Sequence, residues 1–343
     1  DIVEYYKEDF RSNPIGTGPF KFKRWEENIK LVLRKNNDYF QKDVNGSQLP
    51  YLEAISVTFL PEKQSEFLQL VKGKVDFISG LDNSYKDEII NGYGELNEDY
   101  ENKINMLRGP YLNTEYLAFF MESEKNEIKS DLIRKAVNIG FDKGKMIKFL
   151  RNGVGIPANA GFIPVGLPGY KKNNINKYNP ELAKIYVERF KERFNLSPSL
   201  KLTTSSNYLD FCEFIQKELE KLGIEIIIDV IPGSALKQAK ANGKLDFFRA
   251  SWIADYPDAE NYLSLFYSKN FAPNGPNYTH FSDYEYDKIY ENSLRETDPE
   301  KSKLIYSTLD SIISSKSIIV PLFYDCLLYT SPSPRDGLLY RMP

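Results

Sequence analysis

The chain has 343 residues, with 45 basic and 48 acidic side chains and a formal net charge of −3. This length is sufficient for two lobes with separate hydrophobic cores, and the slightly acidic balance argues against a dedicated nucleic-acid-binding protein. No apolar run approaches the ~20 residues that a membrane-spanning helix needs. The two cysteines provide no disulfide framework, so they do not reveal the redox compartment.

The first quarter of the chain combines a hairpin signal with a strand–helix–strand signal. Strands are predicted at residues 20–25, 29–34, 54–60 and 75–78, and a helix at residues 62–72. The first two strands should form a hairpin, and the last two should form a parallel pair with a right-handed crossover. Gly16 and Gly18 precede a strand rather than a helix, which argues against a phosphate-binding loop.

The rest of the chain contains a second strand–helix–strand unit, flanked by capped helices. Strands are predicted at residues 116–121, 200–203, 224–230, 245–251 and 318–323, and helices after Ser130 or Asp131, after Asp142, after Asn179, and at residues 209–221, 284–293 and 298–313. Two α/β units separated by helices predict two similar α/β lobes rather than one continuous sheet. A passage rich in glycine and proline at residues 153–170 has the character of a binding loop.

The stretch from residue 247 to residue 263 concentrates charged and aromatic groups at the end of an apolar strand. Arg249 supplies a cation, Asp255 supplies an anion, and Trp252, Tyr256 and Tyr262 supply flat rings. Such a strand end can hold a zwitterion, because burying an ammonium group without a counter-charge costs several kcal/mol. The alternatives are that the aspartate only caps its turn and that the arginine only forms an internal ion pair.

The neighbouring Asp258 is expected to close the turn, since an aspartate after proline commonly does so. Catalytic chemistry has little support elsewhere. The sole histidine, His280, lies in a loop without a recognisable nucleophile motif, and one histidine with one authentic cysteine cannot build the common zinc sites. We therefore expect no enzyme activity, no cofactor and no metal. A carboxylate-based hydrolase is the alternative from a different class.

The last eighteen residues, 326–343, change character. The run CLLYTS at residues 326–331 corresponds, with one codon choice, to the end of a transposase adapter used in DNA sequencing libraries. We interpret residues 326–343 as a sequencing-adapter artefact and exclude them from the fold prediction. The authentic chain is expected to end near Asp325.

Several short motifs occur along the chain in a characteristic order. They are NPIGTGPF at residues 13–20 with Trp25, RKNNDYF at 34–40, GKVD at 73–76, DLIRKA at 131–136, FDK at 141–143, NPELA at 179–183, WIADYPD at 252–258, YD at 286–287 and VPLF at 320–323. Each motif is weak alone, but the ordered set resembles the extracytoplasmic solute-binding proteins of peptide-type ABC transporters. This is the oligopeptide- and dipeptide-binding family, bacterial solute-binding family 5.

The resemblance implies a two-lobed α/β fold of the periplasmic-binding-protein type (class II, cluster C), incomplete at both ends. Residues 1–115 would form part of lobe I, residues 116–322 lobe II, and residues 323–325 the return crossing to lobe I. The ligand would be enclosed between the lobes. The implied partners are a peptide ligand and ABC permease subunits, at a periplasmic or cell-surface location. Attachment to the membrane would come only from an N-terminal lipid anchor that this chain lacks.

The resemblance also implies roles for individual residues. Asp255 would hold the α-amino group of a peptide, and Arg249 would lie near its carboxylate end. Trp252, Tyr256 and Tyr116 would line the side-chain pockets. Two further groups would lie around them, namely Asn261 and Tyr262. The same fold carries nickel chelates, haem, sugars or opines in related proteins, so a ligand of one of these kinds is the alternative within the binding class.

Overall fold

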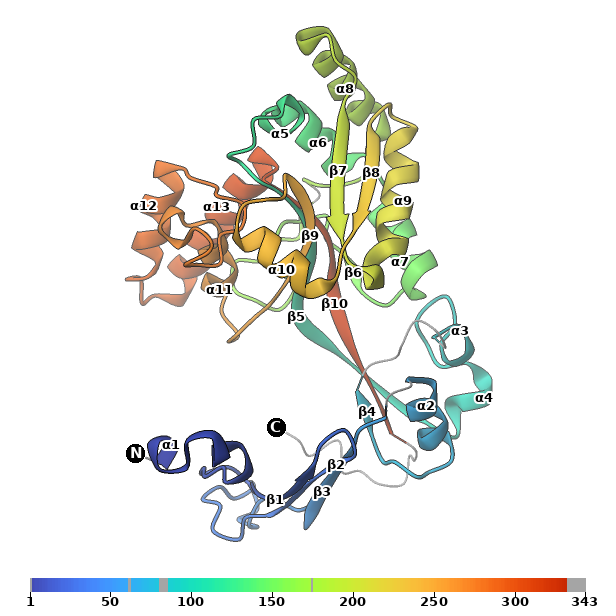
Figure 1. Cartoon of the computed structure of the whole chain (residues 1–343), viewed down its shortest axis with the longest axis vertical. Coiled ribbons are helices and arrows are strands. Elements are labelled where there is room, and N and C mark those ends of the chain that lie inside the picture. Colours follow the sequence, from blue (N-terminus) through green and yellow to red (C-terminus); the bar gives the residue numbers. More distant parts are fainter. Residues whose placement is uncertain (1, 61–62, 80–85, 174, 332–343) are drawn as a thin grey trace. The chain divides into compact units, whose positions relative to one another are not determined.

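The computed structural model describes residues 2–60, 63–79, 86–173 and 175–331 (Figure 1). Contacts between Cα atoms divide the chain into two units, residues 1–78 and 79–343. This division falls before the predicted boundary between residues 115 and 116, which stays a prediction. Residues 332–343 of the segment interpreted as an adapter lie outside the described residues.

The first unit contains a three-stranded antiparallel sheet in the order β1-β2-β3. Its elements are α1 (Ile2–Tyr6), the 3-10 helix η1 (Lys7–Ser12), β1 (Phe20–Glu26), β2 (Lys30–Lys35), β3 (Ala54–Thr58) and α2 (Lys63–Val71). The predicted hairpin is confirmed, and Trp25 lies opposite Leu31. The predicted parallel pair is wrong, because β3 pairs antiparallel with β2 and β4 (Ile78–Ser79) is not part of this sheet.

The second unit is built on a mixed sheet in which the strand order is β10-β5-β9-β7-β8, with β6 paired to β10. The strands are β5 (Asn105–Phe119), β6 (Ile156–Pro157), β7 (Ser199–Thr204), β8 (Glu225–Val230), β9 (Phe247–Ile253) and β10 (Ile319–Ser331). β5 pairs antiparallel with β9 and β10, whereas β7 pairs parallel with β8 and β9. The second strand–helix–strand unit predicted from the sequence is thereby confirmed.

The helices that were predicted for the second unit are present within a few residues of their expected bounds, and further short helices occur beside them. They are α3 (Lys86–Ile89), α4 (Glu98–Glu101), α5 (Asn126–Lys129), α6 (Asp131–Ile139), α7 (Lys143–Arg151), α8 (Pro180–Phe194), α9 (Leu209–Glu220), α10 (Gly233–Ala241), α11 (Glu260–Leu263), α12 (Tyr284–Ser293) and α13 (Pro299–Lys316), with 3-10 helices η2 (Ser206–Tyr208), η3 (Ser264–Phe266) and η4 (Ser268–Asn270). Asp142 accepts a hydrogen bond from the backbone of Lys145, and Asn179 accepts one from Leu182. Within the described residues, every helix is too short or too polar to cross a bilayer.

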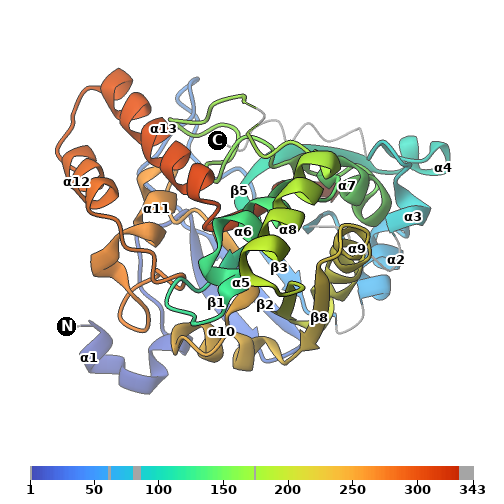
Figure 2. The same cartoon turned by 90° about the horizontal axis from the view of Figure 1, so that it is seen from above.

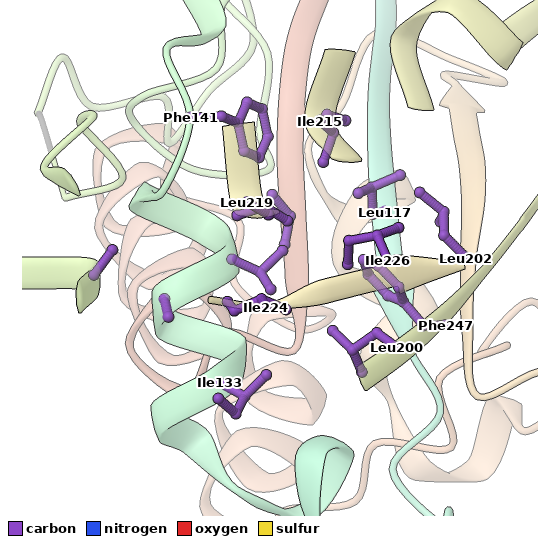
Figure 3. Close-up of a cluster of buried hydrophobic side chains, with 14 of the residues drawn as sticks. Leu117, Ile133, Phe141, Leu200, Leu202, Ile215, Leu219, Ile224, Ile226 and Phe247 are labelled. Carbon is purple, nitrogen blue, oxygen red and sulfur yellow. The ribbon is translucent and has the colours of Figure 1, made fainter. Parts of the chain in front are cut away.

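Alternate residues of β5 and β9 pack into two hydrophobic clusters on opposite faces of the sheet. Leu117 and Phe247 belong to the first core, to which α6, α7, α8 and α9 contribute (Figure 3). Tyr116 and Phe248 belong to the second core, to which α11, α12 and α13 contribute. Figures 1 and 2 show α9 and α13 on opposite sides of the sheet.

The passage at residues 153–170, which has the composition of a binding loop, supplies Phe162, Ile163 and Leu167 to the second core. Full burial of a large apolar side chain stabilises the fold by about 1.5–3 kcal/mol. These three side chains therefore give this passage a structural role.

Candidate functional site

The turn after β9 holds Asp255 at the protein surface. Its side chain is exposed, and the backbone of the strand ends two residues earlier, at Ile253. The carboxamide of Asn261, which is only 4% exposed, lies beneath this turn. Its oxygen accepts hydrogen bonds from the indole N–H of Trp252 at 2.6 Å and from the backbone N–H of Asp255 at 3.3 Å, and its NH2 group donates to the aspartate Oδ2 at 3.4 Å. The structure thus brings three of the predicted site residues together.

The far side of the same turn is anchored by a carboxylate that two tyrosines share. Glu260 accepts hydrogen bonds from the hydroxyls of Tyr256 and Tyr290. The bond to Glu260 raises the pKa of Tyr256 above its usual value. Asp258 accepts a hydrogen bond from the backbone N–H of Glu260 at 2.8 Å, which is the turn-closing contact expected of it. Tyr256 is half exposed beside Asp255 and remains available to a ligand.

Tyr116 and Tyr262 lie in the second core rather than at the surface. Both rings meet Phe162 edge-on, with centroid distances of 5.0 and 5.3 Å. The hydroxyl of Tyr262 donates to the backbone oxygen of Leu112. Burial raises the pKa of both tyrosines well above the usual value. Both tyrosines therefore support the site structurally, as residues of the second core.

Arg249 is already occupied by protein groups. It forms an ion pair with Glu115 of the neighbouring strand β5, and its guanidinium carbon lies 3.2 Å from the ring centroid of Tyr208. The side chains of the arginine and the glutamate are only 12% and 4% exposed. By strand alternation both lie on the sheet face that carries the first core, whereas Trp252 and Tyr116 lie on the other face. The structure therefore separates Arg249 from the aromatic groups predicted to share its site.

Further polar residues extend this ion pair, and sequence reasoning did not select them. Asn113 donates to Glu115 at 3.1 Å and to Asp325 at 3.5 Å. Asp325 in turn forms an ion pair with Arg151. The available signal was the pair of polar residues at alternate positions, 113 and 115, just before an apolar run in β5.

A second cation, Lys240 on α10, interacts electrostatically with Arg249. Burial, together with the charge of Arg249, lowers the pKa of Lys240 to about 8, against an opposing effect of Glu115. The ammonium nitrogen lies 5.2 Å from the ring centroid of Tyr278. Among the residues that the structure describes, no carboxylate lies within ion-pair distance of Lys240. Because lysines are common on amphipathic helices, the sequence did not indicate Lys240 as a candidate site residue.

The groups suited to metal binding or nucleophilic catalysis are dispersed. The described part of the chain contains no group of three or more His, Cys, Asp and Glu side chains that could hold a metal ion. His280 is stacked on Phe271 at 4.4 Å, and its two ring nitrogens lie 3.0 Å from Glu122 and from the backbone oxygen of Ala272. Cys212 is buried, and burial raises the pKa of its thiol to about 11.

The sequence matches a known family model and a curated protein. A family model described as bacterial extracellular solute-binding proteins, family 5 Middle, matches residues 2–274. The probable D,D-dipeptide-binding periplasmic protein DdpA of Escherichia coli K12 is 24% identical over 330 residues, which cover 94% of this chain and 60% of that protein. The chain thus spans about 60% of the length of this curated relative.

Solved structures agree with the predicted α/β fold class. The DppA periplasmic binding protein of Helicobacter pylori, in complex with the peptide STSA, matches with a TM-score of 0.78 and 23% identity over 98% of this chain and 64% of that one. NikA of Brucella suis, in complex with Fe(III)-EDTA, matches with a TM-score of 0.75 and 19% identity over 93% of this chain and 64% of that one. At these identities the likeness establishes the fold and leaves the ligand open.

Proposed function

The chain belongs to family 5 of the bacterial extracellular solute-binding proteins, and from this premise we propose that it binds short peptides outside the cytoplasm and delivers them to the permease subunits of an ABC transporter. A family described by solute binding supports the expectation that the chain is not an enzyme. The D,D-dipeptide-binding protein and the complex with the peptide STSA belong to the same set of relatives. They favour a peptide over other solutes.

The observation that carries this proposal is the exposure of the Asp255 carboxylate. This carboxylate is exposed at the carboxyl end of β9, and the side-chain hydrogen bond that it accepts from Asn261 is long at 3.4 Å. A carboxylate with free acceptor positions can bind the ammonium group of a peptide through charge-assisted hydrogen bonds. Asn261 holds Trp252 beside it, so an aromatic surface adjoins the charge.

Lys240 suits the opposite end of the peptide. Lys240 is half-buried, its pKa is lowered to about 8, and it has no carboxylate partner within the described residues, so a ligand carboxylate would offset the cost of its burial.

A metal chelate is the rival ligand within the same family fold, since NikA was solved with Fe(III)-EDTA. A polyanionic chelate requires several uncommitted cations. Arg249 is neutralised by Glu115, and Asp255 would repel an anion. The charges of this site therefore favour a zwitterionic peptide.

Calorimetry with peptides of two to six residues tests the proposal. We expect Asp255→Asn to weaken binding by about tenfold to a hundredfold, the effect of losing a charge-assisted hydrogen bond. N-acetylation of the peptide should cause a similar loss in the wild type and little further loss in the variant. The matched control is Glu192→Gln, an exposed carboxylate on α8, which should bind normally.

Failure of the wild-type chain to bind any peptide of this set would reject the proposed function. Peptide binding that is insensitive to both Asp255→Asn and N-acetylation would remove Asp255 from its assigned role. Tight binding of a metal chelate in place of peptides would favour the rival ligand.

A further inference from the structure

Two aromatic rings of the candidate site have their polar atoms engaged by the protein itself. The indole N–H of Trp252 donates to the side-chain oxygen of Asn261 at 2.6 Å. The hydroxyl of Tyr256 donates to Glu260, whose other carboxylate oxygen accepts from Tyr290 on α12. An indole and a phenol each have one proton to donate, and both protons are used inside the protein. The two rings therefore offer a ligand carbon surface and no free donor.

This carbon surface lies within reach of the carboxylate that would hold the ammonium group. The carboxamide of Asn261 contacts both sides, since its oxygen accepts from Trp252 and its NH2 group donates to the Asp255 Oδ2 atom at 3.4 Å. Because the oxygen and nitrogen of one carboxamide are about 2.3 Å apart, the indole nitrogen and this Oδ2 atom lie within about 9 Å of each other. Tyr256 follows Asp255 directly in the chain and is half exposed. The first side chain of a peptide branches from the carbon that carries the ammonium, so it would meet these rings.

Glu260 fixes the orientation in which Tyr256 is presented. It is the first residue of α11, and its backbone N–H donates to Asp258 at 2.8 Å. Its carboxylate connects the turn after β9 to α12 through the two tyrosine hydroxyls. A hydrogen bond to a carboxylate is stronger than one between neutral groups. This bond therefore holds the hydroxyl end of an otherwise mobile surface ring against α11 and leaves the ring itself exposed.

We infer that Glu260 is a positioning residue that makes the site select peptides with an apolar first residue, an inference that rests on the proposed peptide-binding function. By holding the hydroxyl of Tyr256, Glu260 leaves only ring surface for the first side chain of the ligand. An apolar side chain is removed from water on this surface, which is favourable. A polar side chain loses its water without gaining a partner, which is unfavourable. The site therefore prefers leucine or phenylalanine to asparagine or serine at the first position.

Peptides that differ only in the first residue read out this preference. Calorimetry compares the tetrapeptides LAAA and NAAA, whose first side chains are similar in size. We expect the wild type to prefer the leucine peptide by about tenfold, the effect of burying part of a leucine side chain. Glu260→Ala releases the Tyr256 hydroxyl, which then becomes available to a polar side chain, and should reduce the ratio to about twofold. Glu260→Gln keeps an oxygen that can accept from a tyrosine and should restore part of the preference.

The matched control is Glu291→Ala on α12. Glu291 also accepts a tyrosine hydroxyl, that of Tyr267, and it pairs with Lys269 at 2.7 Å, but it is not part of the candidate site. This variant should keep the affinity and the ratio of the wild type. If Glu260→Ala does not fold, Tyr256→Ala tests the inference, because it removes the half-exposed ring itself and should also reduce the ratio.

The outcomes separate this inference from the proposed function. A wild-type chain that binds the two peptides equally overturns the inference alone. Equal losses of affinity for both peptides in a folded Glu260→Ala variant, with the ratio unchanged, would give Glu260 a structural role only and also overturn it. A wild-type chain that binds no peptide rejects the proposed function.

Discussion

The first and second cores share strands β5, β9 and β10, yet each has a different kind of buried ion beside it. Beside the first core, Lys143 at the start of α7 lies 3.2 Å from the Asn138 oxygen and 3.3 Å from the backbone oxygen of Ala158. At the second core, Asp310 on α13 accepts a hydrogen bond from the backbone of Phe162 at 2.8 Å. Both ions are thus held by neutral groups.

Neutral partners do not repay the full cost of removing a charge from water, so burial favours the uncharged form of each ion. The pKa of Lys143 is lowered to about 7, and the pKa of Asp310 is raised to about 6. The two sides of the sheet should therefore lose stability in different pH ranges. Neutral partners satisfy the hydrogen-bonding groups of a buried charged side chain, but they do not offset the electrostatic cost of its burial.

The largest expected effect concerns the geometry around Asp310. A Cβ atom at Gly161 would lie 2.1 Å from the Asp310 Oδ2 atom and 2.7 Å from its Cγ atom. We expect Gly161→Ala to lower the free energy of unfolding by roughly 3 kcal/mol or more, because the carboxylate must move away from the Phe162 N–H. Urea denaturation of the wild type and the variant measures the difference.

The control for this substitution is Gly233→Ala at the start of α10, where a Cβ atom would meet nothing within 4 Å. It should change stability by less than about 1 kcal/mol. Equal effects of the two alanines would show that the carboxylate does not confine Gly161. Relief of the Gly161→Ala defect in an Asp310→Ala background would strengthen the assignment, since contacting residues are not additive.

The next effect is the pH dependence beside the first core. The folded pKa of Lys143 lies below the unfolded value of 10.5, so its contribution to stability is present above pH 10.5 and is lost as pH falls through about 7. The wild type should gain stability between pH 7 and pH 9, by up to about 1.4 kcal/mol per pH unit. Lys143→Met should lack this rise.

Denaturation midpoints across pH 7–9 provide the measurement, and Lys148→Met, an exposed lysine on the same helix, is the matched control. The control variant should retain the rise. A Lys143→Met variant with the slope of the wild type would show that another group titrates in this range.

The smallest effect is the corresponding pH dependence of the second core. The folded pKa of Asp310 lies above the model-peptide value of 3.8, so its contribution to stability is present below pH 3.8 and is lost as pH rises through about 6. We expect a decrease of about 1–2 kcal/mol from this group between pH 4 and pH 6. Asp310→Asn keeps an oxygen for the Phe162 N–H and should lack this decrease.

Thermal denaturation at several pH values compares this variant with Asp210→Asn, whose carboxylate is exposed at the start of α9. Only the difference between the two variants is diagnostic, because many carboxylates titrate below pH 6. If both variants follow the wild type, burial of Asp310 has no electrostatic cost.

Sequence patterns determined the local structure and the family of this chain. The caps Asp142 and Asn179, the β7–α9–β8 unit and the strand before Asp255 depend on residues within a few positions of one another, and they occur as predicted. The motif order also pointed to the solute-binding family that the family model matches. The predicted parallel pairing of β3 was wrong, because the residues of a strand and its neighbours in sequence do not determine which other strand it pairs with.

Only the tertiary structure decided what each charged group contacts. The partner of Arg249 is Glu115, 134 residues away in the chain, and it was set by the register of β5 against β9. The same register placed Arg249 and Trp252 on opposite faces of the sheet. Hydrogen bonding between strands acts across any sequence distance, so no local pattern encodes such pairs.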